Sequence, residues 1–196
     1  MKQNFNIYLA SQSPRRIEFL KQLKLKFKNF SVNIDESELE NEMPLNYLSR
    51  IVNLKKEKAF EIMDPNKKNI IITADTIVVL GNKIFQKPQN DIQAFEFLNI
   101  LSGRWHNVIT GYSISNGKEI DFYNFVKTEV LFKKLKESEI NFYITSGEHK
   151  DKAGAYAIQG LGSFMIKKIV GSYSNVVGLP ISELFEDLQR FKIIEL

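Results

Sequence analysis

The segment NIIITADTIVVL, residues 69–80, is a nearly unbroken run of β-branched and other apolar residues. Such a run is typical of a strand that is buried on both faces, and it predicts either one strand or two pieces broken at Asp75. Asp75 is out of place there, because an unpaired carboxylate is costly to bury. It therefore needs a metal, a lysine or backbone donors as its partner, unless it only caps or braces a neighbouring loop.

Helical and extended patterns surround this strand and predict a mixed α/β protein with at least one antiparallel pair of strands. The predicted helices cover 14–24, 44–63, 91–101, 137–146 and 180–191. The other predicted strands cover 5–10, 27–34, 106–114 and 119–132, with an Asn-Gly turn at 116–117. The acidic stretch 34–42 is predicted to be a loop, as is 64–69, and the glycine-rich segment 153–179 is expected to be strand-like.

The composition excludes several classes of protein. There is no cysteine, so a disulfide framework and thiolate chemistry are excluded, and a reducing cytosol is compatible. The first residues lack the apolar core of a secretory signal, and no apolar run approaches the roughly 20 residues that span a bilayer. The 27 basic and 23 acidic residues give a charge of +4, and the lysines occur in short local runs typical of solvated surface. This mild positive charge suits a small anionic substrate better than a nucleic acid.

The loop SQSPRR, residues 11–16, joins the first predicted strand to the first predicted helix. The two arginines stand on the first helical turn, where the macrodipole disfavours cations by a few tenths of a kcal/mol each. A bound multivalent anion would explain them, because a helix N-terminus offers N–H groups to phosphate. Ser13 adds a hydroxyl, and one arginine could bind the ligand while the other braces an acidic neighbour. An ordinary solvated loop is the alternative.

Two further residues have chemistry suited to a ligand. Lys87 precedes a proline, which favours an extended backbone, although it could equally be a surface residue. Gln159 lies in a stretch of small residues where backbone can approach a ligand closely, and its amide both donates and accepts, as reading a base edge requires. The alternative is a Gln159 side chain that bonds only to nearby backbone.

Six motifs, in this order along the chain, resemble those of the Maf family of nucleoside triphosphate pyrophosphatases. They are LASQSPRRIEFL (9–20), ADTIVV (74–79), KP (87–88), GRWHNVITG (103–111), DKAGAYAIQGLG (151–162) and GSYSNVVGLP (171–180). The resemblance runs from the first predicted strand to the last predicted helix. It implies one domain over residues 1–196.

This resemblance implies an α/β protein with the ITPase-like (Maf) fold, a curved mixed β-sheet with helices in two lobes around a nucleotide cleft. Family members hydrolyse nucleoside triphosphates to the monophosphate and pyrophosphate with a divalent metal cation, Mg²⁺ or Mn²⁺. They are often dimeric and have been linked to arrest of septum formation. We therefore expect a cytoplasmic homodimer that binds a nucleoside triphosphate, with no membrane association and no stable nucleic-acid partner.

The family's site residues are carried over by motif. The SPRR loop implies phosphate contacts from Ser13, Arg15 and Arg16, the EKA of the long helix implies one from Lys58, and KP implies one from Lys87. The ADT motif implies Asp75 as proton acceptor and metal ligand, and the acidic pair Asp35 and Glu36 implies Glu36 as second metal ligand. Arg15, Thr76 and Gln159 are implied as the specificity residues, and the DKAGAY motif adds Asp151 and Lys152.

The motif variants also indicate a branch of the family. ADT together with DKAGAYAIQG resembles the branch acting on dTTP and UTP, whereas the branch acting on methylated GTP typically has SDQ in place of ADT. Two other functions are weighed against this one: a non-catalytic nucleotide or nucleic-acid binding regulator of septum formation, and a purine-specific ITPase-like pyrophosphatase. Asp75 and the absence of a basic stripe argue against the first, and Gln159 with ADT argues against the second.

Overall fold

The computed structural model describes residues 1–63 and 67–196. These residues divide into two compact units, each assembled from separate stretches of chain. Unit 1 contains 1–75, 110–125 and 178–196, and unit 2 contains 76–109 and 126–177. The prediction that 1–196 form a single domain stays a prediction.

The helices and strands follow most of the predicted patterns. The helices are α1 (Pro14–Gln22), α2 (Pro44–Ile62), α3 (Asp91–Leu101), α4 (Glu137–Thr145), α5 (Tyr173–Val177) and α6 (Ile181–Arg190), with 3₁₀ turns η1 (Ala153–Ala155) and η2 (Gly160–Met165). The strands are β1 (Lys2–Gln3), β2 (Asn6–Leu9), β3 (Phe27–Asn29), β4 (Asn69–Leu80), β5 (Lys83–Phe85), β6 (Trp105–Ser115), β7 (Asp121–Phe132), β8 (Ile166–Val170) and β9 (Ile194–Glu195). No helix among the described residues meets the length and apolarity needed to cross a membrane.

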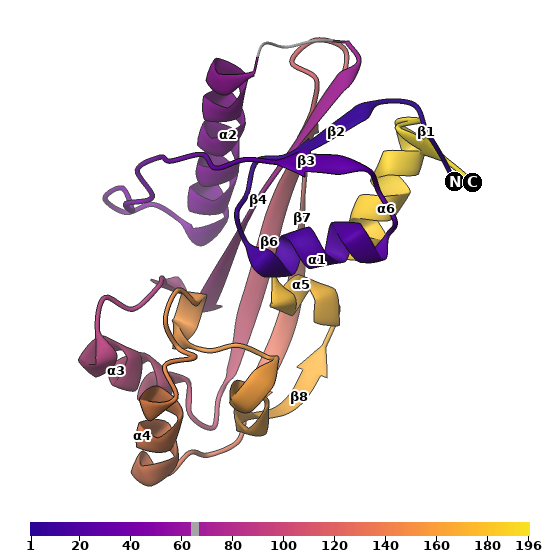
Figure 1. The fold of residues 1–196 in the computed structure, drawn as a ribbon. Coiled ribbons are helices and arrows are strands. Elements are labelled where there is room, and N and C mark those ends of the chain that lie inside the picture. Colours follow the sequence, from indigo (N-terminus) through magenta and orange to yellow (C-terminus); the bar gives the residue numbers. More distant parts are fainter. Residues whose placement is uncertain (64–66) are drawn as a thin grey trace. The chain divides into compact units, whose positions relative to one another are not determined.

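The sheet is mixed, as expected. Its strand order is β3-β2-β4-β6-β7-β8, and β5 pairs with β4. In unit 1, β2 is parallel to both β3 and β4, and the chain ends meet where β1 pairs antiparallel with β9 (Figure 1). In unit 2, β5 is antiparallel to β4 and β8 is antiparallel to β7.

Strand β4 is one continuous strand of 12 residues, so Asp75 does not break it. Residues 70–74 are buried, in agreement with a strand covered on both faces. In unit 1, α2 packs on the neighbouring strands through a small cluster in which Ala59 contacts Ala10 and Ile71. This contact fixes α2 against the part of β4 that leads to Asp75.

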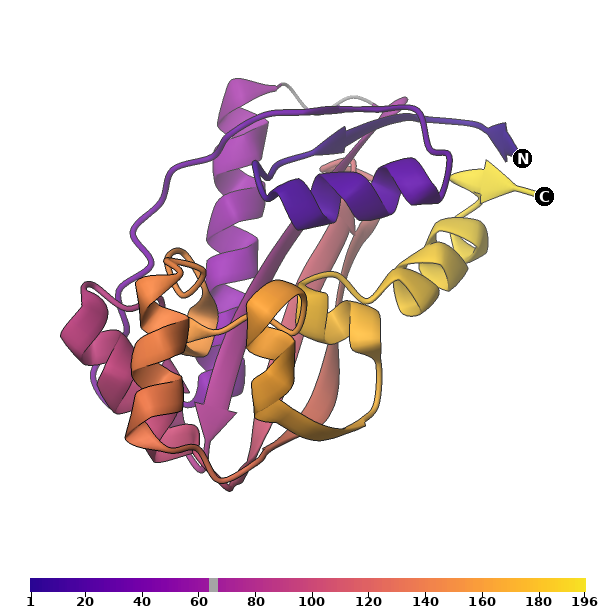
Figure 2. The same cartoon turned by 60° about the horizontal axis from the view of Figure 1, so that its bottom comes forward.

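Unit 2 has its own apolar core, built by α3, α4 and the segment that follows α4. Its buried aromatic residues include Phe97, Phe132, Tyr143 and Tyr156. Asn90 caps α3, because its side chain accepts a hydrogen bond from the Gln93 N–H at 2.9 Å. Figures 1 and 2 show α3 and α4 lying side by side.

Some expectations were wrong in detail. The segment 153–179 was expected to be strand-like, but only Ile166–Val170 is a strand, and Tyr173–Val177 is helical. Gly154, Gly160 and Gly171 have positive φ, which interrupts extended backbone and allows turns. The extended segment expected over 27–34 is a strand only at Phe27–Asn29. Part of the predicted loop 64–69 lies outside the described residues.

Candidate active site

Asp75 lies near the middle of β4 and forms an ion pair with a lysine of α2. Lys55 Nζ is 2.6 Å from Asp75 Oδ1 and 2.7 Å from Glu36 Oε1. One ammonium group therefore joins the two carboxylates that the family motifs single out. Of the partners that the sequence left open for Asp75, the structure provides a lysine.

Lys55 is the site residue that the sequence analysis missed. Its side chain is only 11% exposed, in contrast to most lysines. The signal was present in the helical period, since Leu48, Ile51, Lys55 and Ala59 are spaced by three or four residues and are all buried. A lysine on the apolar face of a helix needs an anionic partner, and the carboxylates of Asp75 and Glu36 satisfy it.

Glu36 is positioned by side chains of α2, although its loop has no regular structure. The Tyr47 hydroxyl donates to the Glu36 carbonyl at 2.8 Å, and Arg50 Nη2 donates to the Ser37 carbonyl at 2.9 Å. Burial raises the pKa of the Tyr47 phenol, and the negative charges of Asp75 and Glu36 raise it further. Tyr47 therefore keeps its proton. The Asp35 carboxylate accepts the Ser37 N–H at 2.9 Å, and this bond lowers the pKa of the Asp35 carboxyl.

The SPRR loop places Pro14 at the first position of α1, where its missing N–H costs no helical hydrogen bond. Ser13 is the N-cap residue, yet its hydroxyl caps no N–H, and the first turn of α1 contains no acidic side chain. Ser11 instead holds the loop, since its Oγ accepts the Ser13 N–H at 3.2 Å. The first turn of α1 therefore contributes no carboxylate of its own that would repel a phosphate.

Arg16 braces the site from within unit 1. Its Nη1 donates to the Ala74 carbonyl and its Nε to the Gly178 carbonyl, both at 2.8 Å. Burial lowers the pKa of the Arg16 guanidinium, and the nearby Asp75 carboxylate counteracts that effect. Arg16 thus ties α1 to the residue that precedes Asp75 through backbone carbonyls, whereas the sequence predicted that one arginine of the pair braces an acidic neighbour. Its direct phosphate contact stays a prediction.

Lys58 forms its ion pair outside the group of Glu36, Lys55 and Asp75. It pairs with Glu61, one turn further along α2, and its side chain is 43% exposed. The structure therefore brings Lys55, not Lys58, to Glu36 and Asp75. A phosphate contact from Lys58 stays a prediction.

The other predicted residues belong to unit 2. Thr76 is partly buried in β4, whereas Lys87, Asp151 and Gln159 are exposed. Among the residues that the structure describes, the Gln159 side chain forms no hydrogen bond or ion pair, so the alternative of an amide bonded to nearby backbone is not observed. Lys152 is partly buried, and its Nζ donates to the Lys150 carbonyl at 3.1 Å.

Neither histidine belongs to the candidate site. His106 is buried in unit 2 with its Nε2 2.8 Å from the Tyr156 hydroxyl. Burial lowers the pKa of His106 to about 4, so the ring is neutral near pH 7. His149 is also buried and its Nε2 lies 3.0 Å from Asp91 Oδ1.

No group of three or more His, Cys, Asp or Glu residues that could hold a metal ion occurs within 1–63 and 67–196. Glu36 and Asp75 nevertheless offer hard oxygen donors that already face one cation, the Lys55 ammonium. Mg²⁺ is commonly held by only one or two carboxylates together with substrate phosphates and water. This donor set fits such an ion.

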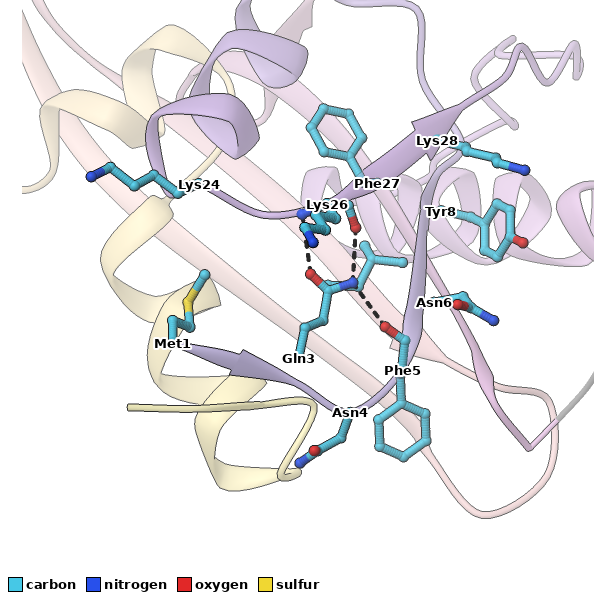
Figure 3. Close-up of a pocket in the computed structure, with 11 residues that line it drawn as sticks. Met1, Gln3, Asn4, Phe5, Asn6, Tyr8, Lys24, Lys26, Phe27 and Lys28 are labelled. Atoms are coloured by element: carbon cyan, nitrogen blue, oxygen red, sulfur yellow. Dashed lines mark hydrogen bonds between the residues drawn. The ribbon is translucent and has the colours of Figure 1, made fainter.

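A separate cavity of about 690 Å³ lies in unit 1, near the N-terminus (Figure 3). Its lining includes lysines but no carboxylate and none of the predicted site residues: Met1, Gln3, Asn4, Phe5, Asn6, Ile7, Tyr8, Lys24, Lys26, Phe27 and Lys28. Among the lining side chains, that of Gln3 donates to the carbonyls of Phe5 and Lys26, each at 2.8 Å (Figure 3). The three lysines are exposed to solvent, so this cavity is not assigned to the candidate site.

Comparisons with known proteins agree with the motifs. The profile of the family described as "Maf-like protein" matches residues 6–191. A dTTP/UTP pyrophosphatase of Geotalea uraniireducens (strain Rf4) is 43% identical, with all of both chains covered. A protein of the same name from Thermoanaerobacter sp. (strain X514) is 45% identical over 94% of this chain and 95% of the relative.

The fold also occurs among solved structures. The Ham1 protein of Staphylococcus aureus superposes with a TM-score of 0.50 at 15% identity, covering 82% of this chain and 79% of that one. At this identity the likeness concerns the fold alone. It supports the mixed α/β architecture that the sequence predicted.

Proposed function

The chain belongs to the Maf family, and on this premise we propose that it is a nucleoside triphosphate pyrophosphatase that converts dTTP and UTP to the monophosphate and pyrophosphate. The observation that carries the proposal is the Glu36–Lys55–Asp75 group, a pair of carboxylates held by one buried ammonium. The names of relatives at 43% and 45% identity support the choice of dTTP and UTP.

In the proposed reaction, Asp75 accepts the proton of the water that attacks the triphosphate. Its carboxylate is fixed by Lys55 at 2.6 Å, and Arg16 holds the preceding carbonyl of Ala74. A base that is already oriented loses little freedom when the substrate binds. Positioned acid–base groups of this kind contribute about 10²–10⁴-fold to rates.

Basic side chains would neutralise the charge that develops on the cleaved phosphates. We assign this role to Arg15, with Lys87 and Lys58 as further candidates, and to Ser13 as a hydroxyl donor at the start of α1. Lys55 joins the set, since its ammonium stands at the carboxylates that meet the substrate. Arg16 contributes by bracing the loop, and its charge adds to the local potential.

We propose Glu36 and Asp75 as the ligands of a divalent cation, Mg²⁺ or Mn²⁺. When bound, the ion would polarise phosphate oxygens and offset their charge. The protein's own part is to hold the two carboxylates in register, through Lys55 between them and through Tyr47 on the Glu36 backbone.

The choice of nucleotide is assigned to Arg15, Thr76 and Gln159. Gln159 is suited to reading a base edge, because its exposed amide has both a donor and an acceptor to offer. A polar group left unpaired by the wrong base costs about 1–3 kcal/mol, which corresponds to tenfold to hundredfold discrimination.

We further propose a homodimer that works in the cytoplasm, without stable nucleic-acid or membrane partners. The family resemblance supports this, and the absence of cysteine fits a reducing compartment. Light scattering coupled to size exclusion tests the dimer directly.

A substrate panel tests the function. The protein is incubated with dTTP, UTP, modified pyrimidine nucleotides, GTP and ITP, with Mg²⁺ or Mn²⁺, and release of pyrophosphate is measured. Turnover of dTTP and UTP that stops on chelation supports the proposal. Release of orthophosphate would indicate attack at the γ-phosphate, preference for ITP would indicate the purine-specific alternative, and binding without any turnover would indicate a non-catalytic regulator.

A further inference from the structure

The segment that carries Gln159 is held in place by two side chains from the region of α4. The Tyr143 hydroxyl accepts the Ala157 N–H at 3.3 Å. The Glu148 carboxylate accepts the Leu161 N–H at 2.9 Å through Oε2 and at 3.1 Å through Oε1. Gln159 lies between these anchors, two residues from each.

Glu148 also packs directly against the residue that follows Gln159. A Cβ added to Gly160 would lie 2.8 Å from Glu148 Oε2 and 2.9 Å from Oε1, a separation that real Cβ atoms essentially never show. Gly160 has a φ of +70°, which glycine adopts without strain. The carboxylate therefore fills the space beside Gly160 and fixes the turn at which the segment changes direction.

The position of Glu148 is itself well determined. It follows α4 in a turn where the Ser146 Oγ donates to the Tyr143 carbonyl at 2.6 Å and accepts the Glu148 N–H at 3.2 Å. The next residue, His149, is 2% exposed. Glu148 thus extends from a turn anchored on both sides, so its carboxylate is a fixed acceptor for the segment 157–162.

The bonds from Glu148 go to backbone N–H groups at the start of η2. The first N–H groups of a helical turn have no partner within the turn, and a carboxylate satisfies them with charge-assisted bonds. Without that acceptor, Leu161 would turn to water and the segment would lose one of its two anchors. The Gln159 amide has no bond of its own among the described residues, so its location depends on the backbone that carries it.

We propose that Glu148 is a positioning residue for nucleotide selection, which holds the segment 157–162 so that the Gln159 amide is oriented before the substrate binds. This rests on the proposed function, in which Gln159 reads the base. The physical gain is preorganisation: a recognition group that is already fixed loses less entropy on binding and tolerates fewer wrong partners.

The test compares Glu148→Ala, Gln159→Ala and the double variant in kcat/KM for dTTP and for GTP. Each single variant should lower the preference for dTTP over GTP by roughly tenfold to a hundredfold, and the double variant should lose no more than Gln159→Ala alone. Glu96→Ala is the matched control, because Glu96 is an exposed glutamate of unit 2 on α3, without an ion pair among the described residues. It should leave the preference unchanged.

A second measurement does not depend on activity. Hydrogen exchange of the peptide covering 157–165 should rise in Glu148→Ala and stay at the parent level in Glu96→Ala. Glu148→Gln keeps one oxygen acceptor without the charge, so it should show intermediate exchange and recover part of the selectivity. It also replaces Glu148→Ala in all comparisons if that variant does not fold.

Unchanged exchange at 157–165 would overturn the anchoring. Increased exchange with equal losses for dTTP and GTP, adding to those of Gln159→Ala, would show that Glu148 only supports the fold and would overturn its role in selection. Failure of the parent protein to release pyrophosphate from any nucleotide would instead overturn the proposed function, together with the selection role, while the exchange data would still decide whether Glu148 holds the segment.

Discussion

Replacement of Lys55 by methionine should destabilise the protein strongly, because it removes the ammonium group that forms ion pairs with both Glu36 and Asp75. Methionine keeps most of the aliphatic stem, so the change isolates the ammonium group. The Lys55 side chain is 11% exposed and that of Asp75 16%, while that of Glu36 is 36% exposed. The bond to Asp75 is therefore the less screened of the two.

The magnitude follows from these contacts. A hydrogen bond to a charged group contributes about 1.5–3 kcal/mol, and removing one partner of a buried ion pair costs about 3–5 kcal/mol. Partial exposure of Glu36 places the net loss near the lower end, at about 3 kcal/mol. At about 2–4 °C per kcal/mol for a chain of this size, Tm should fall by about 6–12 °C.

Lys58→Met is the matched control on the same helix. Lys58 pairs with Glu61 at the surface, and such i,i+3 pairs contribute only about 0.2–0.5 kcal/mol. Thermal unfolding of parent and both variants at pH 7 gives the comparison. Equal Tm changes for the two variants at pH 7 would refute the assignment of Lys55 as the central cation.

Three further predictions concern the same residues and His106. Asp75→Asn keeps an oxygen that can accept from Lys55 but removes the charge of this pair, so it should still fold, with a Tm below that of the parent. It should lose at least about 10²-fold in pyrophosphate release, whereas near-parent turnover would show that Asp75 is structural. Mn²⁺ should raise the Tm of Lys55→Met by more than that of the parent, since Glu36 and Asp75 then face no ammonium, and equal shifts would speak against these two ligands. Burial holds the pKa of His106 at about 4 instead of 6.5, so between these values the unfolded chain binds a proton that the folded chain does not. Stability should therefore fall as the pH is lowered from 6.5 to 4, by up to about 3 kcal/mol, and His106→Gln should remove this slope in denaturant titrations; an unchanged slope would mean that another group causes it.

The parts of the fold that were predicted correctly depend on local patterns. β4 follows from a run of β-branched residues, and α3 follows from a cap that the Asn90 side chain forms. The wrong expectation at Tyr173–Val177 arose because glycine-rich sequence fits both extended backbone and tight turns. Long-range packing decides between them: the Asn175 side chain donates to the Val108 carbonyl at 3.0 Å and to Thr128 Oγ1 at 2.9 Å, contacts that no local pattern encodes.

The candidate site likewise contains residues that could be identified from local sequence patterns and residues that could not. Asp75 could be found from sequence because a carboxylate inside an apolar strand is costly, and that cost required a partner. The motifs did not identify this partner, because the EKA motif implied Lys58 only as a phosphate contact, although the helical period placed Lys55 on the buried face. Glu148 had no such signal, because its role depends on backbone N–H groups 13 residues further along the chain.

The adjacent arginines of the SPRR loop, Arg15 and Arg16, stand on the first turn of α1. On sequence alone, a bound anion would explain two cations on the first turn of a helix, and an ordinary solvated loop was the alternative. For Arg16, the protein itself offsets the unfavourable interaction with the helix dipole. The Arg16 side chain donates to the carbonyls of Ala74 and Gly178, whose oxygens carry partial negative charge. The bond to the Ala74 carbonyl also braces the strand that carries Asp75. Two features of the start of α1 still favour an anion there, since the Ser13 hydroxyl caps no N–H and the first turn contains no acidic side chain. A triphosphate bound at the start of α1 would add anionic charge where both the helix dipole and the neighbouring guanidinium groups favour it.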